Sequence, residues 1–313
     1  MEMEEKMGNQ LRTAFLLAVM TILIMLIGQM FGGRQGMVIA LIFAAGMNFF
    51  SYWFSDKIVL RMYRAQEVSA QQAPDLYAMV NTLAHNAGLP MPRVYIIPQD
   101  TPNAFATGRN PEHAVVAVTQ GLLKLMGRDE IMGVLAHEMA HVKNRDILIG
   151  SIAATMAGAI MMLASMARWS AIFGGYRSDE EGGSSGLGLI LMSILAPFAA
   201  MLVQMAISRS REYQADATGA RFAGKAEGLA SALEKLGAYN RRLPMQSNPS
   251  TAHMFIVNPL SGRSLLSLFS THPPVEERVA RLRGIRPQTA TGGPAGERPS
   301  AMDRGRSMWD QLK

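Results

Sequence analysis

Residues 136–142 read Ala-His-Glu-Met-Ala-His-Val and contain the pattern H-E-x-x-H. Apolar residues at helical spacing around this string predict a helix over 129–144. On a helix, His137 and His141 are four residues apart and share one face, so both imidazoles can reach one ion. Glu138 lies one step round the helix, where its carboxylate can hold a water bound to that ion. Two histidines with an oxygen ligand suit zinc and leave a position for water, so the string predicts one catalytic Zn²⁺ per subunit.

A third ligand must come from elsewhere in the chain. The longer pattern H-E-x-x-H-x-x-G-x-x-H fails because Ile147 occupies its third histidine position, and Asp146 falls on the wrong face of an extended helix. The segment 210–216, SREYQAD, offers Glu212 and Asp216 four residues apart on one helical face. We predict Glu212 as the third ligand and Asp216 as the group that orients a ligand histidine. By spacing alone, two surface acids after a basic segment fit this pattern too.

The chain is unusually apolar. Hydrophobic residues make up 49% of its 313 residues and charged residues only 17%, which is too charge-poor for an ordinary soluble domain. The excess is concentrated in four runs, each near the length of about 20 residues that a helix needs to cross a bilayer core. We therefore predict four transmembrane helices, at about 13–31, 37–54, 147–166 and 187–207.

Basic residues flank these runs unevenly and predict their orientation. Lys and Arg gather before the first run, between the second and third, and after the fourth, whereas acids offset the basic residues of the loop 167–186. Because cytoplasmic segments carry the excess of Lys and Arg, we expect both termini and the segment between runs two and three in the cytoplasm. The H-E-x-x-H string ends just before the third run and the segment 210–216 begins just after the fourth, so both should reach one membrane face.

The spans divide the chain into four parts. Residues 1–55 are expected to form an N-terminal transmembrane hairpin. Residues 56–146 and 208–285 are expected to fold together as one cytoplasmic zinc peptidase domain, into which residues 147–207 are inserted as a second hairpin. Residues 286–313, rich in Pro, Gly, Ser, Thr and Arg, are expected to be a disordered tail.

Periodicity within the two soluble segments predicts an α+β domain. Helices are expected over 74–87, from about 121, over 227–236 with a stop at Gly237, and over 275–282. Strands are expected over 93–98, 103–107 and 114–118. The stretch 241–259 has no clear period and is interpreted as a long loop.

Several classes of function and partner are excluded by composition. The chain has no cysteine, so neither a thiolate metal site nor a thiol nucleophile is available. Its net charge of +6 sits beside the apolar runs rather than on an aromatic-basic stripe, which favours a lipid bilayer as partner over nucleic acid. His85, His113 and His253 belong to no motif and are interpreted as structural. The oligomeric state stays open.

Four strings together resemble the HtpX family of bacterial membrane peptidases, which is related to the CAAX prenyl endopeptidases. They are NAFATG at 103–108, HEMAH at 137–141, EYQAD at 212–216 and STHPPVEER at 270–278. The resemblance covers nearly all of residues 10–285 and leaves the tail unmatched. It implies endoproteolysis of membrane and misfolded proteins at the cytoplasmic face of the bacterial inner membrane, and a link to envelope stress.

The resemblance also gives meaning to residues that spacing leaves undecided. The string at 103–106, taken alone, is a short structural strand; in similar enzymes it is an edge strand that pairs with the substrate backbone. Its residues are Asn103, Ala104, Phe105 and Ala106. His272, taken alone, is a capping or surface residue. By resemblance, His272 and Arg278 would lie near the site and stabilise the oxyanion of the tetrahedral intermediate.

The sequence thus predicts an α+β integral membrane protein with four transmembrane helices, a mainly helical zincin-like catalytic domain and a small β-sheet. Its expected activity is zinc-dependent endoproteolysis of protein or peptide substrates, with Glu138 as the general base. Two alternatives stay open: a processing protease for specific membrane or lipidated peptides, and a non-catalytic membrane scaffold that binds zinc structurally. The charged residues directly after His141 argue against a metal site inside the bilayer.

Overall fold

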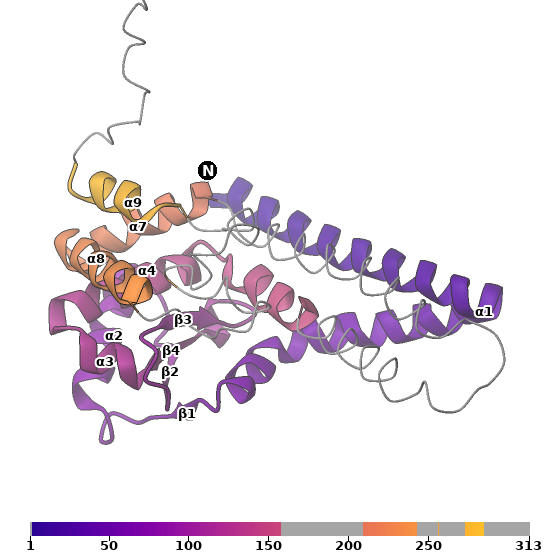
Figure 1. Ribbon diagram of the computed structural model, residues 1–313, viewed down its shortest axis with the longest axis horizontal. Coiled ribbons are helices and arrows are strands. Elements are labelled where there is room, and N and C mark those ends of the chain that lie inside the picture. Colours follow the sequence, from indigo (N-terminus) through magenta and orange to yellow (C-terminus); the bar gives the residue numbers. More distant parts are fainter. Residues whose placement is uncertain (1, 158–208, 243–255, 257–272, 285–313) are drawn as a thin grey trace, which may run out of the picture.

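The structure is a computed structural model, and it describes residues 2–157, 209–242, 256 and 273–284 (Figure 1). Several expectations therefore lie outside the described residues. They are the third span beyond residue 157, the fourth span, most of the loop 241–259, His272, and the tail 286–313.

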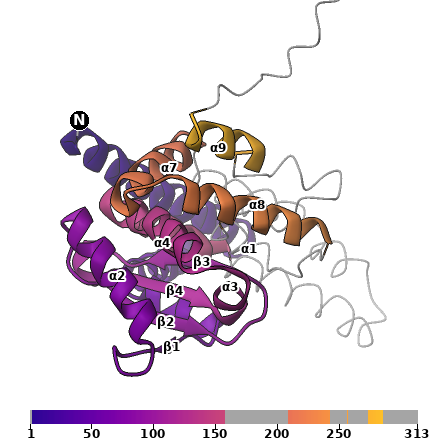
Figure 2. The same ribbon diagram turned by 90° about the vertical axis from the view of Figure 1, so that its left-hand side faces the viewer.

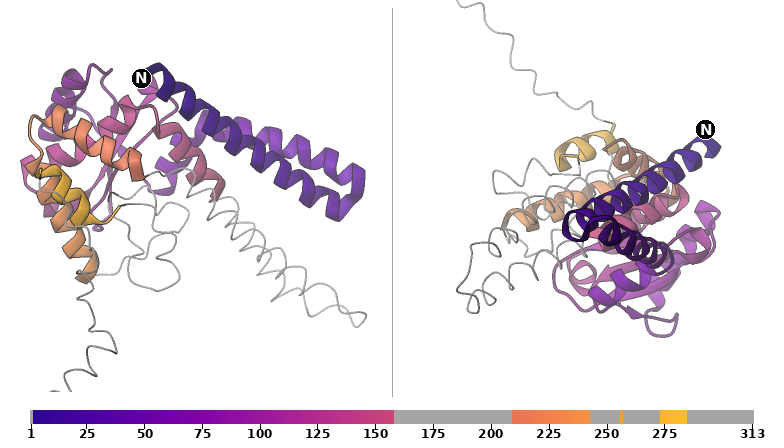
Figure 3. Two further views of the ribbon diagram at one scale, coloured as in Figure 1. Left: turned by 90° about the horizontal axis from the view of Figure 1, so that it is seen from above. Right: turned by 90° about the vertical axis from the view of Figure 1, so that its right-hand side faces the viewer.

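The N-terminal helical segment α1 (Glu2–Met62) folds back on itself and forms two arms that lie side by side and project from the rest of the molecule (Figure 3). The reversal falls at Gly33, whose φ of 56° lies in the left-handed region that glycine adopts without strain. Asn48 of the second arm donates a hydrogen bond from Nδ2 to Oγ1 of Thr21 on the first arm, at 2.8 Å. The polar residue inside the second apolar run thus links the two arms.

Within the part of the chain that the structure describes, one helical stretch, Gly33–Met62, is long and apolar enough to cross a membrane. Only 17% of its most apolar window is buried inside the molecule. The large apolar surface that stays exposed indicates contact with an apolar environment such as a bilayer. Thr13–Leu26 and Ile147–Ala157 are apolar but shorter. The described residues therefore contain one clear candidate span, compared with the four that the sequence predicts.

A four-stranded mixed sheet forms the centre of the remaining structure, in the order β1-β2-β4-β3. The strands are β1 (Gln66–Glu67), β2 (Arg93–Ile97), β3 (Ala104–Thr107) and β4 (Val115–Thr119). β2 and β4 are parallel, while β1 and β3 pair antiparallel at the two edges. All five residues of β4 are buried, because both faces of the sheet are covered.

Helices cover one face of the sheet, and the end of α1 with the apolar helix Ile147–Ala157 covers the other. Figure 2 shows α2 (Pro74–Ala87), α4 (Arg128–Lys143) and α8 (Glu227–Arg242) on one side of the sheet. Val94, Val116 and Val118 pack against residues of these helices. The alternate strand residues pack on the end of α1 and on the helix Ile147–Ala157. These residues are Tyr95, Ile97, Phe105, Val115 and Ala117. The end of α1 and the apolar helix Ile147–Ala157 are therefore attached directly to the sheet.

The helix α4 lies at the centre of the helical layer, between the sheet and α7 (Arg209–Ala223) (Figure 2). A side-chain carbon on Gly219 of α7 would come within 2.8–2.9 Å of the backbone of Ala136 and His137. The missing side chain at Gly219 therefore allows α7 to cross α4 beside the first histidine. The short helices α3 (Gln120–Leu125) and α9 (Val275–Leu282), and the 3-10 turn η1 (Pro111–His113), complete the described fold.

Most of the predicted elements of the soluble part are confirmed, including the helices at 74–87 and 275–282 and the three strands, each within one residue. Two predictions are wrong. α8 does not stop at Gly237 but continues to Arg242, because its packing against α9 extends over this turn; a side-chain carbon at Gly237 would meet Val275 of α9 at 3.5 Å. Asp146 does not continue the helix of the histidines. α4 ends at Lys143, and Arg145 adopts a left-handed φ of 57° that redirects the chain.

Candidate metal centre

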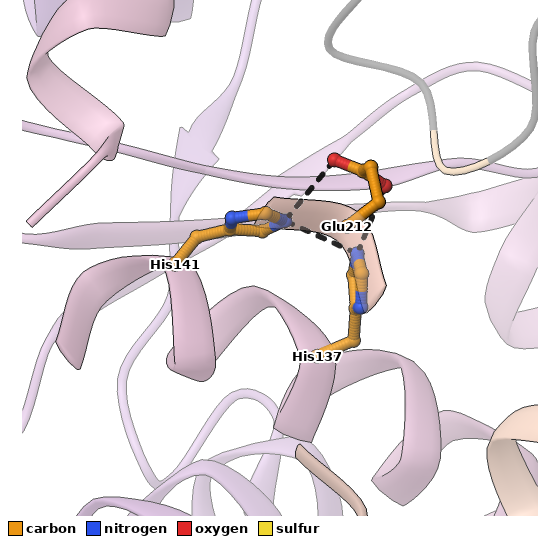
Figure 4. A group of neighbouring side chains, drawn as sticks. All are labelled: His137, His141 and Glu212. Carbon is orange, nitrogen blue, oxygen red and sulfur yellow. Dashed lines mark hydrogen bonds and ion pairs between the residues drawn. The ribbon is translucent and has the colours of Figure 1, made fainter. Parts of the chain in front are cut away.

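Two histidines on α4 and one carboxylate from α7 converge on a point (Figure 4). Nε2 of His137 lies 3.2 Å from Nε2 of His141, and the two rings are perpendicular. The carboxylate of Glu212 lies 3.7 Å from Nε2 of His137 and 3.6 Å from Nε2 of His141. The structure therefore brings together the three residues that the sequence singles out, although 70 residues lie between His141 and Glu212.

These separations fit a single small cation. Zinc binds histidine nitrogen and carboxylate oxygen at roughly 2.0–2.2 Å, so neighbouring ligand atoms around a tetrahedral ion lie about 3.3–3.5 Å apart. The observed distances of 3.2, 3.6 and 3.7 Å are close to this range. Two imidazole nitrogens with one carboxylate are also the donor types that zinc prefers, with a fourth position left for water or substrate. His137, His141 and Glu212 could therefore hold a zinc ion.

Each imidazole is turned toward this point by a carboxylate at its other ring nitrogen. Nδ1 of His137 lies 2.9 Å from Asp216, and Nδ1 of His141 lies 3.0 Å from Asp146. A carboxylate at Nδ1 fixes the proton on that atom and leaves Nε2 with a free lone pair. The sequence predicts Asp216 in this position. It misses Asp146, since continuing an ideal helix past Lys143 would turn that side chain away.

Arg278 of α9 anchors Asp216 from the opposite side. Its Nε and Nη2 donate to the two carboxylate oxygens at 2.9 and 2.7 Å, and its Nη1 donates to the carbonyl of Ile256 at 2.8 Å. The side chain is only 1% exposed. Burial raises the pKa of the Asp216 carboxyl, but the charge and hydrogen bonds of Arg278, with those of His137, lower it more, to about 2. Asp216 is therefore held ionised against His137.

The carboxylate of Glu138 is fixed by the edge strand. Its Oε2 accepts a hydrogen bond from the backbone N–H of Ala106 at 2.9 Å. Burial raises the pKa of Glu138 and the charge of Glu212 adds to this, while the two histidines and the Ala106 hydrogen bond oppose it. A carboxyl with a raised pKa accepts and returns a proton more readily near neutral pH than an exposed glutamate does.

The region is strongly acidic for a buried site. Four carboxylates, none more than 7% exposed, surround the two histidines: Glu138, Asp146, Glu212 and Asp216. Arg278 forms ion pairs with Glu212 and Asp216. Burial lowers the pKa of His141, but Asp146, Glu212 and Glu138 raise it more, to about 10. This charge distribution favours a further bound cation, whose arrival would release the proton of His141.

The side of His141 is the more open one. Its side chain is 17% exposed, compared with 2% for His137 and 6% for Glu212. The string 103–106 runs past the same region: Ala104, Phe105 and Ala106 belong to β3 at the edge of the sheet, and Asn103 directly precedes it. Small Ala side chains let α4 approach this strand closely enough for the Glu138 contact. His272 lies outside the described residues.

An H-E-x-x-H helix, a distant glutamate completing the ligand set, and an edge strand beside the general-base candidate define the class of the protein: it is a metallopeptidase. A family model described as peptidase family M48 matches residues 70–286. The chain belongs to peptidase family M48, and its relatives place it with the HtpX proteases.

Three curated relatives, each named "Protease HtpX homolog", illustrate this. The protein of Desulforapulum autotrophicum is 67% identical over 309 residues, which is 98% of this chain and 100% of the relative. That of Desulfatibacillum aliphaticivorans is 64% identical, over 98% of this chain and 100% of the relative. That of Thermococcus kodakarensis is 59% identical, over 88% and 95%. The chain is a membrane zinc endopeptidase that acts on protein or peptide substrates.

Among solved structures, a crystal structure of Ste24p from S. mikatae matches with a TM-score of 0.47 and 20% sequence identity. The match covers 90% of this chain and 66% of that protein, so this chain spans just under two thirds of its length.

Proposed function

We propose that the chain hydrolyses peptide bonds with zinc held by His137, His141 and Glu212, and with Glu138 as general base. The convergence of the three ligand side chains from two separate helices carries the proposal. When bound, zinc supplies Lewis acidity, which lowers the pKa of water and polarises the scissile carbonyl.

The protein side chains supply proton transfer in this scheme. Glu138 accepts a proton from the attacking water and later delivers it to the nitrogen of the leaving amine. The hydrogen bond from Ala106 holds the carboxylate in one orientation, and burial keeps its proton affinity high. Asp216 and Asp146 keep both imidazoles directed at one point.

The substrate backbone adds to β3 as a further strand. β3 pairs with β4 along one side only, and the carbonyl of Asn103 accepts from Thr119 on that side. Alternation along an antiparallel ladder then turns the backbone groups of Ala104 and Ala106 to the outer side. The N–H of Ala106 is taken by Glu138. Strand addition therefore uses mainly the backbone groups of Ala104 and the carbonyl of Ala106, which brings the scissile bond close to the general base.

For the oxyanion, we retain His272 as the candidate donor. The family resemblance predicts that Arg278 shares this task, but its contacts support a different one. Three of its nitrogens already donate to Asp216 and Ile256, so its guanidinium is occupied in fixing Asp216.

The proposed setting is the cytoplasmic face of the bacterial inner membrane, with misfolded and membrane proteins as substrates. Four spans, two of them in the insertion 147–207, would bring residues 56–146 and 208–285 together on one side. The α1 hairpin and the apolar helix Ile147–Ala157, both attached to the catalytic sheet, support a site close to the bilayer. A catalytic site close to the bilayer surface could cleave membrane proteins at the segments that they expose outside the bilayer.

The test is the variant Glu138→Ala in purified, detergent-solubilised full-length protein. Removing a general base is expected to slow cleavage of an unfolded protein by about 10²–10⁴-fold. Zinc content should stay at one ion per chain, because Glu138 is not a ligand in the proposal. Cleavage is followed by gel electrophoresis or a fluorescent casein, and zinc by atomic absorption.

Glu112→Ala serves as the matched control, since Glu112 is an exposed glutamate on η1. It should cleave at the wild-type rate. Undiminished cleavage by Glu138→Ala would contradict the mechanism. A protein that binds zinc but cleaves nothing, even with Glu138 intact, would favour the structural-scaffold alternative.

A further inference from the structure

Asp146 is attached to His141 twice, although it lies outside the helix that carries the histidine. α4 ends at Lys143, and the left-handed φ of Arg145 turns the chain back. The backbone N–H of Asp146 then donates to the carbonyl of His141 at 3.2 Å. Its side-chain Oδ2 lies 3.0 Å from Nδ1 of the same histidine. This loop therefore presents the carboxylate to the far side of the ring from Nε2.

The carboxylate of Asp146 receives little stabilisation from hydrogen bonds with described residues other than His141. The residue is 7% exposed, and in the described part of the chain its second oxygen, Oδ1, is buried without a hydrogen-bond partner. Burying a carboxylate without full hydrogen bonding is costly. Asp216 is different, because a bidentate arginine compensates its charge. The contact that offsets the burial of Asp146 is the one with His141.

We propose that Asp146 is a positioning residue for the metal centre: it fixes the proton of His141 on Nδ1 and directs Nε2 toward the ion, as Asp216 does for His137. The inference rests on the proposed zinc site. Carboxylates that hydrogen-bond a ligand histidine orient the ring and increase its basicity. Each ligand histidine thus has its own carboxylate, supplied from a different part of the chain.

Asp146 also joins the metal centre to the apolar helix Ile147–Ala157, which begins at the next residue. Five residues on, Ser151 forms a buried hydrogen bond of 2.6 Å with Thr107, the last residue of β3. Ile149 and Ile152 of the same helix pack against Leu16 of the first arm of α1. The direction in which this helix leaves α4 therefore sets the position of Asp146, and with it the ring of His141.

The test compares zinc affinity in the full-length protein, measured by competition with a chromogenic chelator. Asp146→Asn keeps the shape of the side chain and removes its charge, and should weaken zinc binding about 10–100-fold. Asp146→Glu restores the charge and should recover part of this loss. Asp100→Asn removes the same charge from an exposed residue and should bind zinc as the wild type does.

A double-mutant cycle identifies the route of the effect. If Asp146 acts through His141, Asp146→Asn should weaken zinc binding no further in a His141→Ala background. An equal loss in both backgrounds would overturn the proposal. So would wild-type zinc affinity in Asp146→Asn, whether or not the Tm of the zinc-free protein falls, because a lower Tm alone marks a structural role.

The two proposals can fail separately. Loss of zinc affinity in Asp146→Asn supports the inference even if the wild-type protein cleaves no peptide, which would refute only the endopeptidase mechanism. Conversely, the wild-type protein could cleave peptides in a Glu138-dependent way while Asp146→Asn leaves zinc affinity unchanged. This result would support the mechanism and refute the inference about Asp146.

Discussion

Arg278 is the residue at which three segments of the chain meet. It belongs to α9, holds Asp216 of α7 with two hydrogen bonds, and donates a third to the carbonyl of Ile256. Its guanidinium is buried together with the carboxylate that it neutralises. A fork of parallel hydrogen bonds is a geometry that lysine cannot reproduce. The contacts indicate that Arg278 acts on the site through Asp216 and His137.

We therefore expect Arg278→Lys to destabilise the protein even without zinc. Lysine keeps the positive charge but cannot form the paired hydrogen bonds to Asp216, and losing a hydrogen bond to a charged group costs about 1.5–3 kcal/mol. The Tm of chelator-treated protein in detergent measures this loss. Arg241→Lys, at an exposed position on α8, should leave the Tm unchanged. A fall in kcat with an unchanged zinc-free Tm would instead favour the oxyanion role predicted from the family resemblance.

The residues of the metal centre differ in how far the sequence predicts them. His137, Glu138 and His141 follow from one helix and its period, and Glu212 and Asp216 from a second short motif whose spacing matches a helix. The sequence does not predict the role of Asp146, because the position of this residue depends on one backbone angle, the left-handed φ of Arg145. Non-glycine residues rarely adopt that conformation, so no pattern of polarity signals it. The chemical signal that points to Asp146 is the need of a second ligand histidine for a partner at Nδ1.

At the scale of elements, the site depends on how α7 crosses α4. Glu212, Asp216 and Gly219 share one face of α7, so the glycine lies in the same contact as the two acids. The backbone of His137 would lie 2.8–2.9 Å from a side-chain carbon at Gly219. Close approach of the two helix backbones is therefore a condition for Glu212 to reach the histidines.

Gly219→Ala should push α7 away from α4. Overpacking of this kind costs about 1–3 kcal/mol, and the shift should separate Glu212 from His137 and weaken zinc binding. Gly46→Ala is the matched control, since a side-chain carbon at Gly46 of α1 meets nothing within 4 Å. Chelator competition and cleavage of an unfolded protein measure both variants. Wild-type zinc affinity in Gly219→Ala would show that the crossing tolerates the extra carbon.

Elements are predictable where local period and packing agree, as in the helix at 74–87 with its glycine stop at Gly88. They are mispredicted where tertiary contacts override a local signal. Gly237 carries the same stop signal as Gly88, yet α8 continues through it in contact with α9. β1 has only two residues, Gln66 and Glu67, both exposed, so no hydrophobic alternation marks it.

At the scale of the molecule, the apolar segments form part of the catalytic domain. The sheet lies between the helical layer of α4 and a second layer made by the end of α1 and the helix Ile147–Ala157 (Figures 1 and 3). Phe105, beside the general-base contact, packs on Tyr63, the residue that follows α1. β3, the strand proposed to pair with substrate, is therefore supported from behind by the segments proposed to enter the bilayer.

The proposed topology is testable because the chain has no cysteine of its own. Ser69→Cys places a single thiol at an exposed position of the catalytic domain, and Ser184→Cys places one in the loop 167–186. If both termini and the catalytic domain face the cytoplasm, a membrane-impermeant maleimide should label Ser184→Cys in spheroplasts, and Ser69→Cys only after permeabilisation. The excess of Lys and Arg beside the catalytic segments is the physical reason for this orientation.

The unmodified chain, which has no thiol and cannot react, measures background labelling. Labelling of Ser69→Cys in intact spheroplasts would reverse the orientation, and protection of Ser184→Cys would mean that the segment 147–207 does not cross the bilayer twice.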